Sequence, residues 1–166
     1  PLILDVGCGQ GMSSIRLATE HPEATVLAID PSKKRLHTLE CTPTPPNLRI
    51  IRSDAAHVWR YLGATHSLQA AYFFYPNPYP KSTDWKKRWY AQPAWENLLK
   101  ISSKVVIRSN FYLYLLEAQQ SAHWLGATHS CLDMVTPEDP WTHFEAKYFN
   151  AGSTCFSLVI EGLRKE

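Results

Sequence analysis

Three glycines within five positions follow the first apolar run of the chain. The run Leu2–Val6 favours a β-strand, and a segment of helical composition begins at Ser13. Between the two lie Gly7, Gly9 and Gly11. Glycine tolerates positive φ and allows a backbone to approach a ligand closely. The order of strand, glycine loop and helix therefore predicts a turn that lies against a bound ligand.

Strand-like and helical segments alternate along the rest of the chain. Apolar, β-rich runs occupy Leu2–Val6, Thr25–Ile29, Leu48–Arg52, Ala70–Tyr75 and Lys104–Arg108. Helical composition or spacing marks the segments between and after them, at Ser13–Glu20, Lys33–Glu40, Ala55–Leu62, Pro93–Lys100 and Phe111–Trp124. This alternation predicts an α/β, Rossmann-like fold with a mostly parallel sheet and helices on both faces.

Two more strand-like runs, Ser130–Thr136 and Thr154–Glu161, follow the last of these helices. The polar segment between them contains proline, and we interpret it as a loop. We expect the two runs to form an antiparallel C-terminal strand pair. This pair brings the predicted sheet to seven strands.

The length of the chain favours one domain. With 166 residues, of which 45% are hydrophobic, it can bury a core as a single unit over residues 1–166. Pro1 stands directly on the first strand, so we expect an N-terminal segment to be missing. The formal net charge of +2 is too small to predict nucleic acid binding by itself, because phosphate affinity depends on clustered Lys and Arg.

The remaining composition excludes several classes of protein. The four cysteines are far apart and form no CxxC pair, which indicates free thiols in a reducing compartment. The seven histidines show no metal-ligand spacing, so no metal site is predicted. No apolar run approaches the roughly 20 residues of a membrane span, and no signal peptide opens the chain. We therefore expect a soluble cytoplasmic protein, either monomer or homodimer.

The spacing of the glycines favours one class of cofactor. Gly9 and Gly11 are two positions apart, whereas the dinucleotide fingerprint places its third glycine three residues after the second. This difference favours S-adenosyl-L-methionine over NAD. Asp30 ends the second strand, where a carboxylate can accept both ribose hydroxyls, and Asp54 and Ala55 follow the third strand, within reach of an adenine amino group.

The predicted cofactor site thus combines the ends of three successive strands. Its residues are Asp5, Gly7, Gly9, Gly11, Asp30, Asp54 and Ala55. Asp5 has a second, compatible interpretation as a structural carboxylate that holds the glycine loop. Open α/β sheets bind ligands at the carboxyl ends of their strands, which is where all of these residues are expected.

The segment after the fourth strand is stiff. Pro76, Pro78 and Pro80 restrict its backbone to extended conformations, at the place where the methyl group of the cofactor should point. The ten residues from Lys81 to Tyr90 then contain four basic and three aromatic side chains. Cations for phosphates and flat rings for unstacked bases suit a structured RNA. The alternative is a solvated loop whose aromatic side chains pack on the next helix.

Several blocks, in order along the chain, resemble the tRNA (guanine-N7)-methyltransferase family. The run Phe73–Lys81, followed by Lys87-Arg88 and Gln92-Pro93, is similar to the family's Phe-Pro-Asp-Pro-Trp-Pro-Lys, its basic pair and its Gln-Pro. Ser109-Asn110-Phe111 resembles its Thr-Asp-Trp, and Thr142–Glu145 resembles its Thr-Lys-Phe-Glu, which contacts the guanine. The resemblance implies the seven-stranded methyltransferase fold, S-adenosylmethionine as cofactor and tRNA as partner.

The same resemblance implies roles for individual residues. It places Asn77 and Asn110 at catalytic positions, and Lys81, Asn110, Thr142 and Glu145 at substrate-binding positions. Two departures stand out, because Asn77 and Asn110 each occupy a position where the family has Asp. Guanine N7 has a free lone pair, so its methylation needs no base at N7 and leaves a cationic ring, which a carboxylate would stabilise. With both carboxylates replaced by amides, Glu145 is the main anionic candidate to meet the guanine.

Two other functions remain open at this point. The same enzyme class could act on a small molecule or a protein, or the chain could be a degenerate, non-catalytic module that binds RNA or a partner. Asn77 and Asn110 keep both alternatives open.

Overall fold

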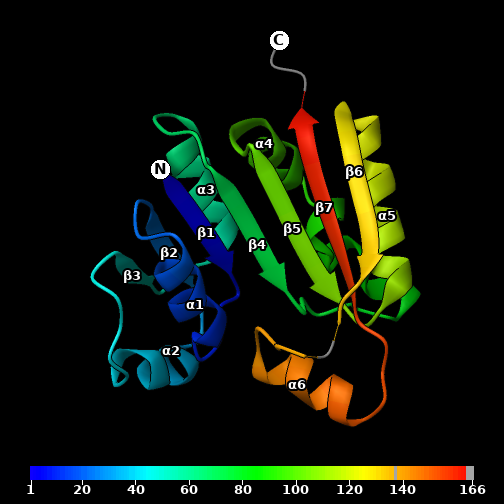
Figure 1. The fold of residues 1–166 in the computed structure, drawn as a ribbon. Coiled ribbons are helices and arrows are strands. Elements are labelled where there is room, and N and C mark those ends of the chain that lie inside the picture. Colours follow the sequence, from blue (N-terminus) through cyan, green and yellow to red (C-terminus); the bar gives the residue numbers. More distant parts are fainter. Residues whose placement is uncertain (137, 164–166) are drawn as a thin grey trace.

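The computed structural model describes residues 1–136 and 138–163. Within these residues, seven strands form one sheet in the order β3-β2-β1-β4-β5-β7-β6 (Figure 1). The strands are β1 (Leu2–Val6), β2 (Thr25–Ile29), β3 (Leu48–Ile51), β4 (Ala70–Phe74), β5 (Lys104–Ser109), β6 (Ala127–Met134) and β7 (Phe156–Leu163). The first five pair in parallel, and β7 pairs antiparallel with both β5 and β6. This arrangement confirms the predicted Rossmann-like fold and its antiparallel C-terminal pair.

Helices cover both faces of the sheet. The helices are α1 (Met12–Glu20), α2 (Lys33–Glu40), α3 (Ala55–Gly63), α4 (Ala94–Ile101), α5 (Tyr112–Trp124) and α6 (His143–Asn150), with two short 3₁₀ segments, η1 (Ser82–Lys87) and η2 (Trp89–Ala91). The core has two apolar layers. One contains Trp59, Trp95 and Tyr114 from α3, α4 and α5, and the other contains Leu17 and Leu36 from α1 and α2.

Alternating side chains of the central strand β1 pack into the two layers. Leu4 and Val6 pack in the layer of α3, α4 and α5, whereas Ile3 packs in the layer of α1 and α2. Successive side chains of a strand point to opposite faces, so a strand covered on both faces is apolar at nearly every position, with Asp5 as the exception in β1. This requirement explains why the parallel strands could be predicted as continuous apolar runs.

The segment between the last two strands differs from the prediction. We interpreted it as a loop, but it contains the helix α6, which lies below the carboxyl ends of β4 and β5 in Figure 1. The reason is local, because Thr142 caps the helix and its hydroxyl accepts a hydrogen bond from the backbone N–H of Glu145. Strand β6 also begins at Ala127, three residues before the predicted start at Ser130.

The order of the strands positions the site. From β1 the chain proceeds through β2 to β3 on one side, and it returns to β4 and β5 on the other side of β1. The gap between the carboxyl ends of β1 and β4 is therefore the point where the winding direction reverses. Doubly wound sheets bind their ligands at this point.

Candidate active site

The glycine loop begins with Gly7, directly after β1, and leads into α1. Gly7, Gly9 and Gly11 all have positive φ, of 72°, 60° and 84°. A Cβ at Gly7 or Gly9 would meet no other described atom within 4 Å, so these two positions face open space. A Cβ at Gly11 would overlap the buried side chain of Leu39, so a larger residue here would force Leu39 on α2 to shift.

Asp5 lies beneath the loop and is 1% exposed. Its Oδ2 accepts hydrogen bonds from the hydroxyls of Ser13 (2.6 Å) and Ser14 (2.5 Å), at the start of α1. Burial raises the pKa of the Asp5 carboxyl to about 6, although the two hydroxyls oppose this shift; the charge of Asp30 adds to it. Asp5 therefore joins β1 to α1 from below, which fits the structural interpretation of this carboxylate.

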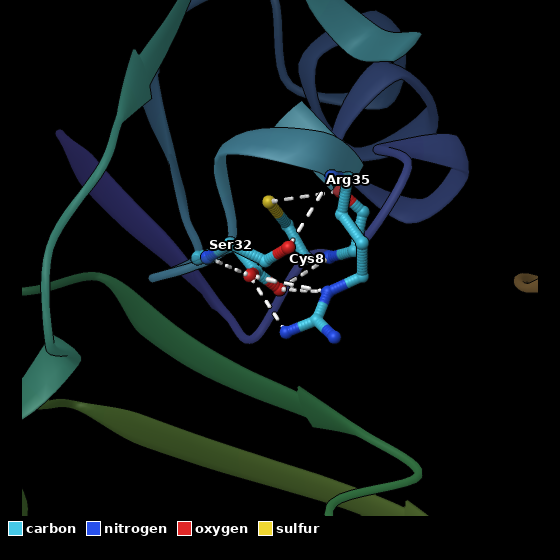
Figure 2. Close-up of polar contacts among 5 residues, drawn as sticks. Cys8, Ser32 and Arg35 are labelled. Carbon is cyan, nitrogen blue, oxygen red and sulfur yellow. Dashed lines mark hydrogen bonds and ion pairs between the residues drawn. The ribbon is translucent and has the colours of Figure 1, made fainter. Parts of the chain in front are cut away.

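Asp30 follows β2 and receives four donor groups. Its carboxylate accepts from the backbone N–H of Gly9 (3.1 Å) and of Ser32 (2.8 Å). The guanidinium of Arg35 contacts both oxygens through Nε, and its Nη2 lies 2.8 Å from Oδ1 (Figure 2). The Asp30 side chain is 2% exposed, whereas that of Arg35 is 54% exposed. Arg35 thus covers the carboxylate from the solvent side.

The thiol of Cys8, also drawn in Figure 2, lies 4.0 Å from the carbonyl oxygen of Gly9. Burial, together with the charges of Asp5 and Asp30, raises the pKa of this thiol well above its usual range. The protonated thiol is not a nucleophile. We therefore treat Cys8 as a packing residue of the loop.

Asp54 follows β3, where it caps α3 and borders a cavity. Its Oδ1 accepts from the backbone N–H of Ala56 (2.8 Å) and caps α3. Asp54 remains exposed, whereas Ala55 beside it is buried. Both residues border the cavity described below.

The loop after β4 has an unusual and tightly held backbone. Tyr75 and Tyr79 both have positive φ, of 54° and 43°, which non-glycine residues rarely adopt. The side-chain oxygen of Asn77 accepts from the backbone N–H of Tyr79 at 3.1 Å. Because this bond occupies Oδ1, the amide group of Asn77 can offer its N–H donors to a ligand.

Arg88 fixes the far end of that loop from inside the protein. It is 7% exposed, and its Nη2 and Nε donate to the carbonyl oxygen of Tyr79 at 2.9 and 3.3 Å. Its Nη1 contacts the hydroxyl of Tyr90 (2.9 Å) and the carboxylate of Glu117 on α5. Arg88 is therefore a buried support of the loop and does not present its charge at the surface.

The basic and aromatic segment Lys81–Tyr90 divides into two parts. Trp89 packs on the core rings of Trp59 and Phe73, with centroid distances of 5.1 and 5.9 Å. Trp85, by contrast, is 49% exposed, and the exposed side chain of Lys87 pairs with Asp84 at 2.9 Å. The end of the segment therefore packs against the core rings of α3 and β4, and its first part faces solvent.

Glu145 lies on α6 and is fully buried. It accepts from the hydroxyl of Tyr75 (2.8 Å), from Nη1 of Arg108 (3.1 and 3.2 Å) and from the backbone N–H of Trp141 (2.5 Å). Burial raises the pKa of the Tyr75 hydroxyl, and its interactions with Cys155 and Glu145 raise it further. The hydroxyl therefore stays protonated and donates. Neither Arg108 nor Tyr75 was predicted as a partner of Glu145.

One cavity of about 1140 Å³ brings most of these elements together. Of the predicted residues, those that line it are Gly7, Gly9, Gly11, Asp30, Asp54, Ala55, Asn77, Asn110 and Thr142. Asp5, Lys81 and Glu145 are not part of its wall as the structure describes it: Asp5 and Glu145 are buried behind the wall, and Lys81 is exposed outside it.

Several other residues of the same cavity were not predicted from the sequence. They are Arg35 on α2, Tyr75, and four residues of α6, His143, Phe144, Lys147 and Tyr148, whereas Lys86 and Lys87 belong to the basic and aromatic segment already predicted. The sequence signal for α6 is Thr142 followed three residues later by Glu145, which is the pattern of a helix capping box. The contact of Arg35 with Asp30 has no such local signal.

The described residues contain no group of three or more His, Cys, Asp and Glu side chains placed to hold a metal ion. In the same part of the chain, no helix has the length and apolar character needed to cross a membrane.

Comparison with known proteins points to one reaction type. A family model described as "putative methyltransferase" matches residues 1–158. The tRNA (guanine-N(7)-)-methyltransferase of Mycolicibacterium paratuberculosis is 30% identical over 96% of the chain, and that of Pasteurella multocida is 29% identical over 95%. The chain spans 65% and 66% of the length of these two relatives.

Solved structures of similar fold also carry methyltransferase titles. A mutant 16S rRNA (adenine(1408)-N(1))-methyltransferase from Catenulisporales acidiphilia, with its cosubstrate SAM, matches with a TM-score of 0.68 and 17% identity, over 99% of this chain and 87% of that one. A SAM-dependent methyltransferase from Archaeoglobus fulgidus matches with a TM-score of 0.61 and 14% identity, over 97% and 86%. At these identities the likeness shows the fold.

Proposed function

The chain belongs to this putative methyltransferase family, and on that premise we propose that it is an S-adenosylmethionine-dependent enzyme that methylates guanine N7 in tRNA. The observation that carries the proposal is the single cavity that joins the glycine loop and Asp30 to the rigid Tyr75–Tyr79 loop. Relatives named for this reaction match almost the whole chain, which supports the choice of substrate.

The residues present fit S-adenosylmethionine. Gly7 and Gly9 face open space at the cavity wall, and their missing side chains leave room for a ligand against the backbone. Asp30 would hold the ribose hydroxyls, and Asp54 with Ala55 would border the adenine. When bound, the cofactor supplies a methyl group on a positively charged sulfur.

The chain's own contribution to the reaction is mainly placement. The lone pair of guanine N7 is free, so no residue has to remove a proton from the attacking atom. The loop Tyr75–Tyr79 is held by Arg88 and by the bond between Asn77 and Tyr79, so it presents a fixed surface to the base. The Asn77 amide can offer its N–H donors to acceptor atoms of the base, and Asn110 lines the same cavity.

The rim of the cavity suits an RNA substrate. Lys86 and Lys87 line one side and Lys147 lines the side formed by α6. Phe144 is 60% exposed at the same edge and can stack on an unpaired base. A base within folded RNA has to be exposed or turned out to reach such a cavity. The proposal includes a cytoplasmic location, which a tRNA substrate favours.

A nucleoside assay tests the proposal. The protein is incubated with unmodified tRNA and S-adenosylmethionine labelled in the methyl group, and the RNA is then digested to nucleosides. We expect label in 7-methylguanosine, and none with Asp30→Ala. Label in a different nucleoside would move the proposal to another RNA base. No label, in protein that binds the cofactor by calorimetry, would favour a small-molecule or protein substrate, or a non-catalytic module.

A further inference from the structure

Every acceptor site on the Glu145 carboxylate is already used inside the protein. Oε1 accepts from the Tyr75 hydroxyl and from Nη1 of Arg108. Oε2 accepts from the same Nη1 and from the backbone N–H of Trp141. A carboxylate has about four lone-pair sites, so these four contacts fill them. A base that used Glu145 would have to displace one of these donors.

The donor that is hardest to displace is Arg108. This residue lies on β5, its side chain is 18% exposed, and its guanidinium stacks 5.1 Å from the ring of Trp141 and 5.8 Å from that of Phe74. Among the described residues its Nε has no hydrogen-bond partner. Removing Glu145 from it would leave a largely buried cation without its carboxylate, which is strongly unfavourable.

The contacts of Glu145 join three separate elements at the cavity wall. Tyr75 begins the strained loop after β4, Arg108 belongs to β5, and Trp141 precedes α6. The ring of Tyr75 also packs against that of Tyr148 on α6, with a centroid distance of 5.4 Å. Because Tyr75 and Tyr148 both line the cavity, the position of Glu145 determines how this part of the wall is placed.

The preceding loop is held in the same way. The ring of Trp141 contacts two cations, with Arg16 at 4.3 Å and Arg108 at 5.1 Å from its centroid. The guanidinium of Arg16 also pairs with Asp139 at 2.5 Å. The entry to α6 is therefore fixed to α1 and to β5 together, with the Glu145–Arg108 pair at its centre.

We infer that Glu145 is a positioning residue, which acts through Arg108 and Tyr75 to place the loop after β4 against α6, and that it does not contact the target base. The resemblance to the guanine-N7 enzymes implied the opposite role for this residue. The substrate contacts of α6 then belong to its cavity-lining residues His143, Phe144 and Lys147. Only the last arm of the test below rests on the proposed function.

A double-mutant cycle tests the inference without any substrate. Glu145→Gln, Arg108→Met and the double variant are compared with wild type by thermal unfolding and by calorimetric binding of S-adenosylmethionine. Each single variant leaves a charge or polar group unpaired, so we expect a lower unfolding temperature for each. The double variant removes both charges together, and we expect it to unfold above Glu145→Gln. Additive losses would overturn the inference.

Methyl transfer to tRNA gives the second arm. We expect kcat to fall about tenfold in Glu145→Gln and to return to within about threefold of wild type in the double variant. Arg108→Lys, which keeps a cation for Glu145, should retain more activity than Arg108→Met. Phe144→Ala on the same helix is the matched control, with a raised KM for tRNA and an unchanged unfolding temperature. A raised KM for tRNA with an unchanged unfolding temperature in Glu145→Gln, and no return of kcat in the double variant, would show that Glu145 contacts the base.

The two arms separate this inference from the proposed function. Coupled unfolding together with no label in tRNA would support the positioning role and overturn the tRNA substrate. Label in 7-methylguanosine together with additive losses of unfolding temperature would support the tRNA substrate and overturn the positioning role.

Discussion

Arg35 covers the carboxylate of Asp30, with Nη2 of the guanidinium 2.8 Å from Oδ1. Asp30 is the residue proposed to hold the ribose of the cofactor, so the ion pair lies where the ribose hydroxyls would bind. The backbone N–H groups of Gly9 and Ser32 occupy other parts of the same carboxylate. If Asp30 holds the ribose as proposed, cofactor binding requires Arg35 to move, and the half-exposed position of its side chain allows this.

Arg35→Gln should tighten the binding of S-adenosylmethionine. The variant removes a competitor of the ribose hydroxyls, and a partly exposed ion pair contributes about 0.2–1 kcal/mol, which corresponds to about a 1.5- to 5-fold change in Kd. Calorimetry measures the effect, and Asp30→Ala is the control that should weaken binding severely. Weaker binding by Arg35→Gln would show that Arg35 contributes to the cofactor site instead of competing for it.

Gly11→Ala should destabilise the protein more than Gly9→Ala does. Both positions have positive φ, which costs an alanine about 1–2 kcal/mol. Only the Cβ at Gly11 would meet Leu39, and overpacking of this kind adds about 1–3 kcal/mol. Urea unfolding of the two variants gives the comparison. Equal losses of unfolding free energy would mean that the Leu39 side chain, or α2 with it, shifts without cost.

The sequence predicts that the glycine loop, Asp30, Asp54 and Ala55 meet at one site, and they line one cavity, because the signals of these residues are local. Glycine is favoured where φ is positive, as at Gly7, and a carboxylate directly after the neighbouring strand is read from the sequence, as at Asp30. Continuous apolar runs predict the parallel strands for the same reason, since a strand covered on both faces has no polar side. These features require no knowledge of which segments meet in space.

The other half of the cavity depends on contacts between distant segments. Nothing near Glu145 in the sequence indicates that Arg108 lies beside it, 37 positions earlier in the chain. Helix α6 buries only Glu145, so it lacks the apolar periodicity that would predict a helix. Arg88 was grouped with its basic neighbours, although its position against Tyr79 and Glu117 makes it an internal support.

Asp5→Asn should stabilise the protein at neutral pH and not at low pH. The pKa of Asp5 is raised from 3.8 to about 6 in the folded protein, so the unfolded chain loses this proton first as pH rises. Asp5 therefore reduces stability progressively between about pH 4 and pH 6, by up to about 3 kcal/mol in total. Asparagine has no charge to bury and can still accept a hydrogen bond from Ser13 or Ser14.

Urea unfolding of both proteins at several pH values measures this difference. Other titrating groups are common to the two chains, so they cancel when the free energies of unfolding are subtracted. We expect a difference that grows from about pH 4 and levels off above about pH 6 to 7. A difference that is the same at all pH values would mean that Asp5 is not buried as a charged group.

Asn77→Asp should raise methyl transfer to guanine N7. One oxygen of the new carboxylate can keep the bond to the backbone N–H of Tyr79, so the loop is expected to hold its shape. The second oxygen would place negative charge near the methylated, cationic ring, and about a tenfold rise in kcat corresponds to about 1.4 kcal/mol of transition-state stabilisation. Single-turnover rates on tRNA measure the step, and Asn77→Ala is the control expected to fall. Equal or lower turnover by Asn77→Asp would indicate that the amide N–H donors serve a different substrate.

Arg88 and Lys86 are two positions apart in the same basic segment, but substitution of Arg88 should reduce stability whereas substitution of Lys86 should reduce only tRNA binding. Arg88→Met removes the buried support of the Tyr79 carbonyl and leaves Glu117 without its partner, so we expect lower unfolding stability and lower kcat. Lys86 is exposed on the rim, and Lys86→Ala should leave the unfolding temperature unchanged while it weakens tRNA binding. If Lys86 neutralises one phosphate, the slope of log K against log salt becomes shallower by about one. Because the Arg88 side chain is only 7% exposed, Arg88→Met should leave the salt slope unchanged. A slope that changes in Arg88→Met and not in Lys86→Ala would contradict the prediction.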